Sequence, residues 1–169
     1  MAQAPLAVPA HPWTVDDLMT LPDDSLRYEI VDGSLHVSPL PAAQHGLLAT
    51  RLYDVLRPGV PKNLLLLVGG VGVSARPLGR ELQFLIPDLL VVRSDAAPLC
   101  SPDAIYFSPE DVPLVVEVVS PSSVTHDLVT KRDLYALLAI PHYWVVREER
   151  SGITVRLLEL HDGAYVEEA

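Results

Sequence analysis

An acidic residue interrupts a short apolar stretch in the second half of the chain. Residues 114–119 read L-V-V-E-V-V, a β-branched run that is typical of a buried strand, and Glu117 stands within it. An unpaired buried carboxylate is costly, so Glu117 is expected to have a metal ion, a cation or a hydrogen-bond network as its partner. Asp88 is a second carboxylate inside an apolar run, at 84–92, and alternation places it on one face with apolar neighbours. The sequence therefore predicts two buried acids in two strands of a small domain.

A helix with an inward-facing lysine is expected to follow the strand that carries Glu117. The chain turns at 120–123, S-P-S-S, and a helical pattern extends from about 126 to 138. The 3.6-residue period puts Lys131 in the apolar stripe of this helix instead of on the solvated face. The chain contains only two lysines, Lys62 and Lys131, and its other basic residues are arginines. An inward ammonium in a chain that prefers arginine favours a site formed by Glu117 and Lys131.

The remaining pattern predicts an α/β (α+β) fold, in which a mixed central β-sheet is flanked by helices. A tight turn at Asp32-Gly33 predicts a β-hairpin near the N-terminus, and Thr14 with Asp17 resembles a capping box at the start of a short helix. Residues 93–111 are interrupted by prolines and are expected to form a surface loop. The expected elements are helices at 15–21 and 42–56, hairpin strands at 27–31 and 34–38, and strands at 64–68, 71–74, 84–92, 142–146, 153–160 and 164–166.

Two further polar residues lie inside predicted elements. Glu29 stands in the strand at 27–31, where an edge-strand carboxylate facing water explains it as well as a buried one does. His45 falls on the apolar face of the helix at 42–56. A histidine in such a position more often forms hydrogen bonds within the fold than binds a metal or a substrate. The apolar residues of that face are Leu48, Ala49, Leu52, Val55 and Leu56.

Length and charge limit the classes of protein that this chain can represent. At 169 residues it is long enough for one domain with a sizeable core, which we place at 13–169 after a flexible lead-in at 1–12. The formal charge of −10 gives no general attraction to nucleic acids or anionic membranes. Cys100 is the only cysteine, which excludes a disulfide framework. No apolar stretch reaches about 18 residues and the first residues do not resemble a signal peptide, so we expect a cytoplasmic protein without a membrane span.

The two acids and the lysine suit the hydrolysis of phosphodiesters. Asp88 and Glu117 on neighbouring strands can hold a divalent cation such as Mg²⁺ or Mn²⁺, which prefers oxygen ligands. The ammonium of Lys131 can steady or help deprotonate a water molecule and offset charge that develops on a phosphate. The glycine-rich stretch at 69–72 is not followed by Gly-Lys-Ser/Thr, so it is no phosphate-binding P-loop. The histidines lack the spacing of a zinc site.

Several motifs, taken in order, resemble those of the Uma2 family, also called DUF820. They are P-D at 87–88, E-V-V-S-P-S-S at 117–123, D-x-x-x-K-x-x-x-Y at 127–135 and I-P-H-Y-W-V-V at 140–146. The resemblance extends from about Trp13 to Val166. It implies a restriction-endonuclease-like fold of the PD-(D/E)XK nuclease superfamily and a metal-dependent endonuclease that acts on DNA.

The resemblance also implies roles for individual residues. The superfamily pattern E-x-K expects a lysine at position 119, where this chain has Val119, and the family resemblance implies that Lys131 supplies the ammonium instead. Glu29 is then an additional acid near the metal, and His45 a phosphate contact or a group that supports the metal ligands. Asp127 is a further candidate, although capping the helix or pairing with Lys131 explains it better than metal binding does.

Other interpretations stay open from the sequence alone. Asp88 and Glu117 could be the relict of an active site held by hydrogen bonds, with Lys131 as their buried counter-ion. The protein would then be a catalytically inactive nuclease-fold binding or interaction module. The negative charge, which disfavours contact with a polyanion, supports this alternative. A metal-dependent hydrolase of another substrate is a third possibility. Nucleases that cut both strands often pair their subunits, so a homodimer is expected for the first interpretation.

Overall fold

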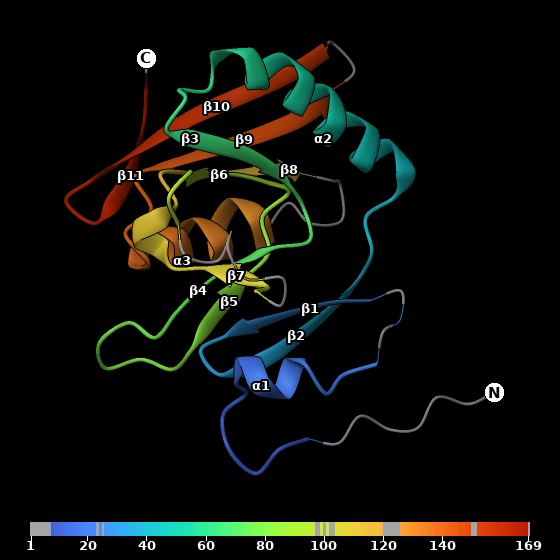
Figure 1. The fold of residues 1–169 in the computed structure, drawn as a ribbon, viewed down its shortest axis with the longest axis vertical. Helices are drawn as coiled ribbons and strands as arrows, with labels where there is room; N and C mark the ends of the chain where they lie inside the picture. Colours follow the sequence, from blue (N-terminus) through green and yellow to red (C-terminus); the bar gives the residue numbers. More distant parts are fainter. Residues whose placement is uncertain are drawn as a thin grey trace.

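The computed structural model describes residues 8–22, 24, 26–96, 99, 101, 104–119, 126–149 and 152–168. Two β-sheets are layered, with α3 between them, α2 on the outer face of the larger sheet and α1 at the far end of the smaller one (Figure 1). The helices are α1 (Val15–Leu18), α2 (Ala43–Leu56) and α3 (Arg132–Leu137). The strands are β1 (Leu26–Val31), β2 (Ser34–Pro39), β3 (Leu64–Val68), β4 (Gly72–Ala75), β5 (Gln83–Leu85), β6 (Leu89–Arg93), β7 (Tyr106–Phe107), β8 (Leu114–Val119), β9 (His142–Glu149), β10 (Gly152–His161) and β11 (Ala164–Glu167).

Both sheets are mixed, as expected for this α/β fold, but the predicted single central sheet is divided into two. The smaller sheet has the order β2-β1-β5-β4-β7 and the larger one β11-β10-β9-β8-β6-β3. The expected strand at 84–92 is the point of division, because β5 ends at Leu85 and β6 begins in the other sheet at Leu89. Pro87 has no N–H to donate to a ladder, so the chain leaves one sheet there and enters the next.

The larger sheet is built around a parallel pair of strands. β8 and β9 are parallel, and the helical segment between them lies against the sheet face that meets the smaller sheet (Figure 1). This segment begins as a π-helix, His126–Lys131, and continues as α3, so the predicted regular helix at 126–138 is wrong in its first turns. The Ser-Pro-Ser-Ser turn predicted before it lies outside the described residues.

The main core fills the space between the two sheets and α3. Tyr135 of α3 and Tyr143 of β9 are fully buried, with ring centroids 5.4 Å apart, and Tyr165 of β11 lies 5.6 Å from Tyr143. These three tyrosines form the aromatic part of this core. No helix in the described ranges is long and apolar enough to cross a membrane.

The other predicted elements agree with the structure except in details. The capping box of α1 is present, with Thr14 and Asp17 bonded in both directions, but the helix ends at Leu18 instead of residue 21. The loop predicted at 93–111 contains the short strand β7. Val55 was expected on the buried face of α2 and is 76% exposed. That face centres on Ala49 and Leu56, about a quarter of a turn from Val55.

Gly72 provides a test of how closely β4 and β5 pack. A Cβ atom at this position would lie 2.8 Å from the ring of Phe84 and 3.2 Å from the carbonyl oxygen of Leu85. We expect Gly72→Ala to lower the free energy of unfolding by about 1–3 kcal/mol, because the buried neighbours must move. Gly46→Ala is the control: it adds a methyl group to open space on α2 and should raise the free energy by roughly 1 kcal/mol. Urea unfolding measures both changes. A Gly72→Ala variant with the same free energy of unfolding as the wild type would contradict the close packing of β4 against β5.

Candidate active site

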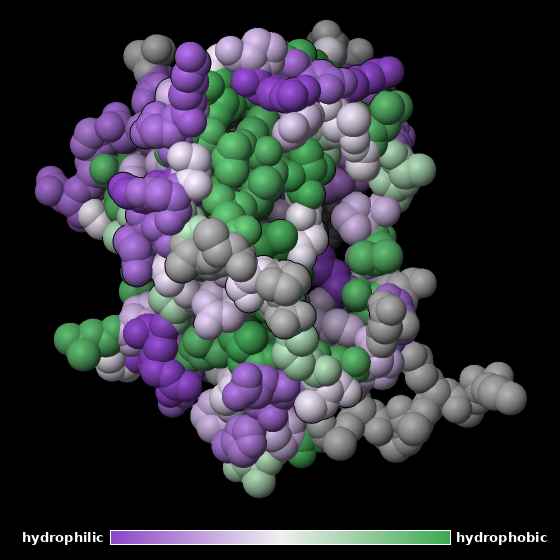
Figure 2. Space-filling view, viewed as in Figure 1, coloured by the Kyte–Doolittle hydropathy of each residue, from purple (hydrophilic) through white to green (hydrophobic). Residues whose placement is uncertain are grey.

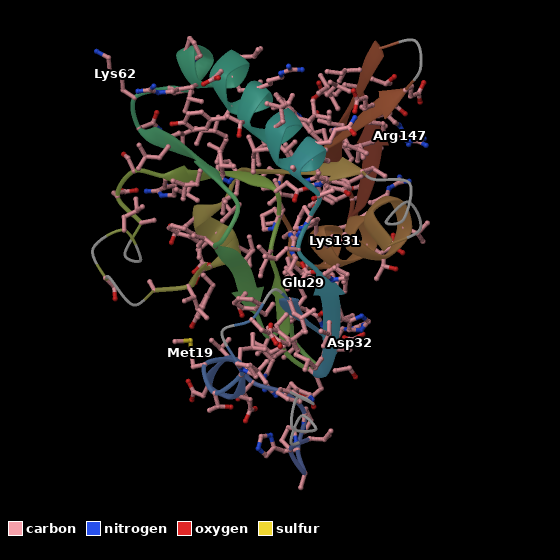
Figure 3. All side chains as sticks on the ribbon, turned by 90° about the vertical axis from the view of Figure 1, so that its right-hand side faces the viewer. Met19, Glu29, Asp32, Lys62, Lys131 and Arg147 are labelled. Carbon is pink, nitrogen blue, oxygen red and sulfur yellow. The ribbon has the colours of Figure 1, made fainter. Side chains whose placement is uncertain are left out.

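Lys131 lies where the π-helix passes into α3, between the two sheets. Its side chain is 2% exposed, which agrees with its predicted inward direction, whereas Lys62 projects from the surface far away (Figure 3). The ammonium nitrogen Nζ donates to Glu117 Oε1 at 2.8 Å, lies 3.1 Å from Glu29 Oε1, and is 3.3 Å from the carbonyl oxygen of Ile86. Lys131 therefore joins β8 of the larger sheet to β1 of the smaller sheet.

Glu117 is 1% exposed and receives two hydrogen bonds from the helical segment. Besides the bond from Lys131, the Tyr135 hydroxyl donates to Glu117 Oε1 at 2.7 Å. Tyr135 follows Lys131 by four residues, so both side chains leave the helix on the same face. Burial and then the charge of Glu117 raise the pKa of Tyr135 well above its ordinary value, so the hydroxyl remains a donor. Tyr135 therefore has this polar role in addition to its place in the core.

Glu29 is buried, so the alternative of a water-facing edge carboxylate is wrong. Its Oε1 accepts a hydrogen bond at 2.7 Å from the backbone N–H of Ile86, in addition to the contact with Lys131. Ile86 belongs to the segment that links the two sheets. This segment thus contacts the cluster through both its N–H and its carbonyl group.

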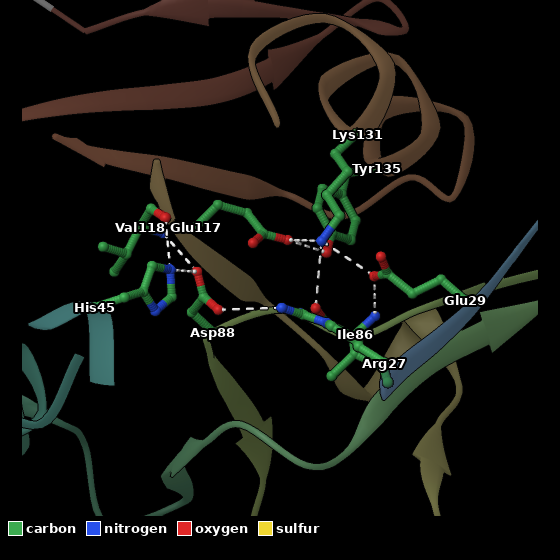
Figure 4. A network of polar contacts seen from close by, with 9 residues as sticks. All are labelled: Arg27, Glu29, His45, Ile86, Asp88, Glu117, Val118, Lys131 and Tyr135. Atoms are coloured by element: carbon green, nitrogen blue, oxygen red, sulfur yellow. Dashed lines mark hydrogen bonds and ion pairs between the residues drawn. The ribbon is translucent and has the colours of Figure 1, made fainter. Parts of the chain in front are cut away.

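Asp88 lies at the end of the same linking segment. Continuing the β6–β8 register by one position places it opposite Glu117. Its Oδ2 accepts a hydrogen bond at 2.7 Å from the N–H of Val118 and lies 3.2 Å from His45 Nε2, while its Oδ1 lies 3.5 Å from Arg27 (Figure 4). Asp88 is thereby surrounded by donors from β1, α2 and β8.

His45 reaches this cluster from the first turn of α2. Its Nε2 is 2.7 Å from the carbonyl oxygen of Val118 as well as 3.2 Å from Asp88. The hydrogen bond to Asp88 raises the pKa of His45, although burial acts in the opposite direction. Burial opposes ionisation of Asp88, but His45 and Arg27 hold the pKa of that carboxyl below its ordinary value.

Arg27 is part of the cluster and was not predicted from the sequence. It stands two residues before Glu29 on β1, so the period of a strand directs both side chains to one face, and this alternation was the available signal. Its Nε and NH2 are buried without a hydrogen-bond partner among the described residues. Such groups are rare in folded proteins because they lose water without replacement.

The cluster has a nearly balanced charge. Glu29, Asp88 and Glu117 supply three carboxylates, against the permanent cation of Arg27 and the ammonium of Lys131. Burial alone would lower the pKa of Lys131, but Glu117 and Glu29 raise it well above its ordinary value, so the amine stays protonated. Protonation of His45 or the arrival of another cation offsets the remaining negative charge.

The structure brings together Asp88, Glu117, Lys131, Glu29 and His45, which are five of the six candidate residues. The sixth, Asp127, lies in the π-helix, and its side chain is outside the described part of the chain. The region around Cys100 is likewise not described.

The cluster contains oxygen atoms of the kind that hard divalent cations bind. Among the described residues, no group of three or more histidine, cysteine, aspartate and glutamate side chains is arranged to hold a metal ion. A backbone oxygen supplements the carboxylates, however: Asp88 Oδ2 and the Val118 carbonyl oxygen converge on a single point, now held by His45 Nε2. A carboxylate and a carbonyl oxygen are ligands that Mg²⁺ or Mn²⁺ accepts, and these ions keep several water ligands besides.

Comparison with known proteins identifies the class to which this α/β fold belongs. A solved structure from Anabaena variabilis, described as "a putative nuclease belonging to DUF820", has a similar fold, with a TM-score of 0.65 at 15% sequence identity over 93% of this chain and 83% of that chain. The chain itself belongs to the Uma2 family, described as "Putative restriction endonuclease", which it matches over residues 15–169. No curated protein matches it. The family supports a nuclease-like function and contact with nucleic acid.

Removing the central ammonium should strongly destabilise the fold. We expect Lys131→Met to lower the free energy of unfolding by about 3–5 kcal/mol, because two buried carboxylates lose their shared cation. Lys62→Met, at the exposed second lysine, should change it by less than about 0.5 kcal/mol. The double variant Glu117→Gln/Lys131→Met should lose less free energy of unfolding than the sum of the losses in the two single variants, because the two residues interact directly. Denaturant unfolding of the four variants tests this, and additive effects would show that the pair is not coupled.

The pairing of His45 with Asp88 should make stability depend on pH. The pKa of His45 is raised in the folded protein above its ordinary value of 6.5. The contact with Asp88 therefore gives its full contribution to stability below pH 6.5. This contribution should be lost as the pH rises through the folded pKa. We therefore expect His45→Gln to destabilise the protein more near pH 6 than near pH 8.5, in unfolding measurements across that range.

A matched control uses His142, which lies on β9 outside the cluster. His142→Gln should show no comparable change between the two pH values. A destabilisation by His45→Gln that is equal at both values would show that His45 is held as a neutral group.

Proposed function

We propose that this protein is a divalent-metal-dependent endonuclease that hydrolyses phosphodiester bonds in DNA. The single observation that carries the proposal is the position of Asp88, which the β6–β8 register, continued by one residue, sets opposite Glu117, with the Lys131 ammonium 2.8 Å from Glu117. The family assignment supports the same class of activity. Asp88, Glu117 and the carbonyl group of Val118 are the groups that would hold the metal.

The chain's own residues have distinct tasks in this proposal. A bound Mg²⁺ or Mn²⁺ would supply Lewis-acid stabilisation and lower the pKa of a coordinated water molecule. Lys131 is held as an ammonium by Glu117 and Glu29, so it serves as a hydrogen-bond donor and a counter-charge instead of a proton acceptor. This narrows the role expected from the sequence, where help with deprotonation was also considered.

Arg27 and His45 suit the substrate side of the same site. Two nitrogen atoms of the Arg27 guanidinium, Nε and NH2, have no hydrogen-bond partner among the described residues, and phosphate oxygens are strong acceptors for their N–H groups. His45 supplies a further donor beside Asp88. In the proposed reaction both residues orient the phosphate, while Tyr135 and the Ile86 backbone hold the carboxylates in place.

The alternative is an inactive nuclease-fold module that binds a partner. The observation in its favour is that the carboxylates already have cationic neighbours: Lys131 for Glu29 and Glu117, and Arg27 with His45 for Asp88. Carboxylates that all have a cationic neighbour could remain as a structural feature. Metal binding separates the two functions, because only the first requires a cation to enter the cluster.

The test is titration with Mn²⁺ by calorimetry, followed by cleavage assays with Mg²⁺ or Mn²⁺. We expect saturable binding in the wild type, and a weakening of about tenfold or more in Asp88→Asn and Glu117→Gln, since each loses a charged oxygen ligand. Cleavage of plasmid DNA should fall by about a hundredfold or more in the same variants. Single-stranded DNA and a small phosphodiester, assayed in parallel, identify the substrate class.

Asp95→Asn is the matched control, because this aspartate is 69% exposed and, among the described residues, forms its ion pair with Arg93 at the surface. It should bind metal and cleave DNA like the wild type. A folded wild type that binds no Mn²⁺, with or without DNA present, and cleaves none of the three substrates would support the binding module instead.

A further inference from the structure

A pocket of about 520 Å³ opens directly beside the candidate active site. Arg27 and Asp88 belong to both, because they are part of the polar cluster and also line this pocket. Figure 4 shows their side chains directed toward one another. A group bound in the pocket would therefore lie next to the residues at which the proposed reaction takes place.

Apart from these two residues, the described lining of the pocket carries no charge. Leu26 of β1 and Leu40, which follows β2, contribute to its walls, together with Ile105 and the aromatic residues Tyr28 and Phe84. The pocket thus combines apolar and aromatic walls with one guanidinium and one carboxylate. Such a combination suits a ligand with an apolar ring that is joined to a charged group.

The turn between β3 and β4 also lines this pocket. It contains Gly69 and Gly70, whose φ angles of +50° and +74° favour glycine over other residues. The N–H of Gly69 donates to the carbonyl oxygen of Asp88 at 2.8 Å, so the turn is fixed to the candidate site. The glycine-rich stretch that is no P-loop therefore has a structural role as a wall beside Asp88.

The other large apolar hollow of the described structure is separate from the site. It measures about 420 Å³ and lies at the end of α2, where Figure 2 shows apolar side chains gathered below this helix. None of its described lining residues belongs to the polar cluster. Continuity with the cluster therefore distinguishes the pocket at Arg27 and Asp88.

The charges of the protein favour contacts with bases over contacts with a long phosphate backbone. A protein that follows a duplex through its phosphates needs many free lysines and arginines, whereas this chain has a net charge of −10. Four exposed arginines already form ion pairs with carboxylates: Arg76 with Glu81, Arg80 with Asp32, Arg93 with Asp95 and Arg156 with Glu167. Contacts with a base do not depend on net charge, and stacking of one base strengthens binding by roughly tenfold or more.

The size of the pocket limits what part of a nucleic acid can enter it. Its volume of about 520 Å³ lies within the range of about 300–1,000 Å³ that is typical of pockets for small organic ligands. One nucleoside can occupy such a space, but a duplex cannot, so the nucleotide must leave the base stack. Only the sugar separates the base of a nucleotide from its phosphate. A phosphate beside Arg27 therefore brings its base within reach of the pocket.

We propose that this pocket binds the base of a nucleotide next to the phosphate that is cleaved. The inference rests on the proposed nuclease function and specifies its substrate as DNA that is unpaired at the site of cleavage. Leu40 and Ile105 contact the base, while Arg27 orients the adjoining phosphate. Plasmid DNA remains a substrate, because negative supercoiling favours local opening of the duplex.

A comparison of two oligonucleotides tests the binding of a base. One is a thymidine oligonucleotide, and the other has the same length and phosphate charge but carries no bases. Their affinities are measured by fluorescence anisotropy in Ca²⁺, which takes oxygen ligands as Mg²⁺ does. The thymidine oligonucleotide should bind about tenfold more tightly or better. Equal affinities, or no binding of either oligonucleotide, would overturn the proposal.

Two variants in the pocket wall connect this difference to the pocket. Leu40→Ser changes a residue that is 55% exposed, and Ile105→Ala shortens a second apolar side chain. Each should reduce the ratio of the two affinities by about threefold or more, because apolar contact with the base is lost. Leu78→Ser is the matched control, since this leucine is fully exposed and lies outside the pocket lining. A ratio that stays at the wild-type value in both folded wall variants would overturn the pocket as the site of the base.

Cleavage with Mn²⁺ separates this inference from the proposed function. A duplex with a single-nucleotide bulge should be cleaved about tenfold faster or more than the same duplex without it, because the bulged nucleotide is already unpaired. Cleavage of both duplexes at one rate, with equal affinities for the two oligonucleotides, would overturn the base pocket and leave the nuclease function in place. Binding that depends on the base, without cleavage of any substrate, would support the pocket and contradict the nuclease function.

Discussion

A single buried ammonium connects the two halves of this molecule. Lys131 Nζ lies within 3.1 Å of Glu29 on one sheet and 2.8 Å of Glu117 on the other, and it also contacts the carbonyl of Ile86 in the segment that links them. Neither carboxylate could be buried between two apolar layers without this cation. The position of Lys131 depends on the geometry of the helical turn at which the π-helix continues as α3. Irregular turns of this kind occur often at functional sites.

The energetic cost of this arrangement argues that it serves a function. Replacing a buried ion pair by apolar residues of similar size is often neutral or stabilising, so stability alone does not explain three buried carboxylates. The buried donors of Arg27 that lack a described partner add to that cost. Local departures from the rules of folding concentrate at functional sites, and this cluster contains several of them within one region.

The sequence predicted the fold class and most strand positions because strand signals are local. Apolar runs located β1, β2, β3, β8 and β10 to within one residue at each end, whereas β9 extends three residues past its predicted end. The inward face of Lys131 followed from the helical period. The division into two sheets was missed, since nothing local at Pro87 distinguishes a bend within a strand from a change of sheet. Arg27 and the hydroxyl of Tyr135 were missed for a related reason, because their partners lie on other elements. The π-helical start was missed because a regular period was assumed.

The cluster consists of a tightly held half and a looser half, and this difference bears on how it could accept a cation. Lys131 and Tyr135 hold Glu117 at 2.8 and 2.7 Å, and the Ile86 N–H holds Glu29 at 2.7 Å, with Lys131 at 3.1 Å from it. Asp88 is fixed by the Val118 N–H at 2.7 Å, but its two cationic neighbours, His45 and Arg27, stand at 3.2 and 3.5 Å. A long arginine side chain and a histidine at the start of a helix can move without disturbing either sheet. An incoming cation or phosphate therefore meets least resistance at Asp88, while Lys131 keeps the position that the proposed reaction requires.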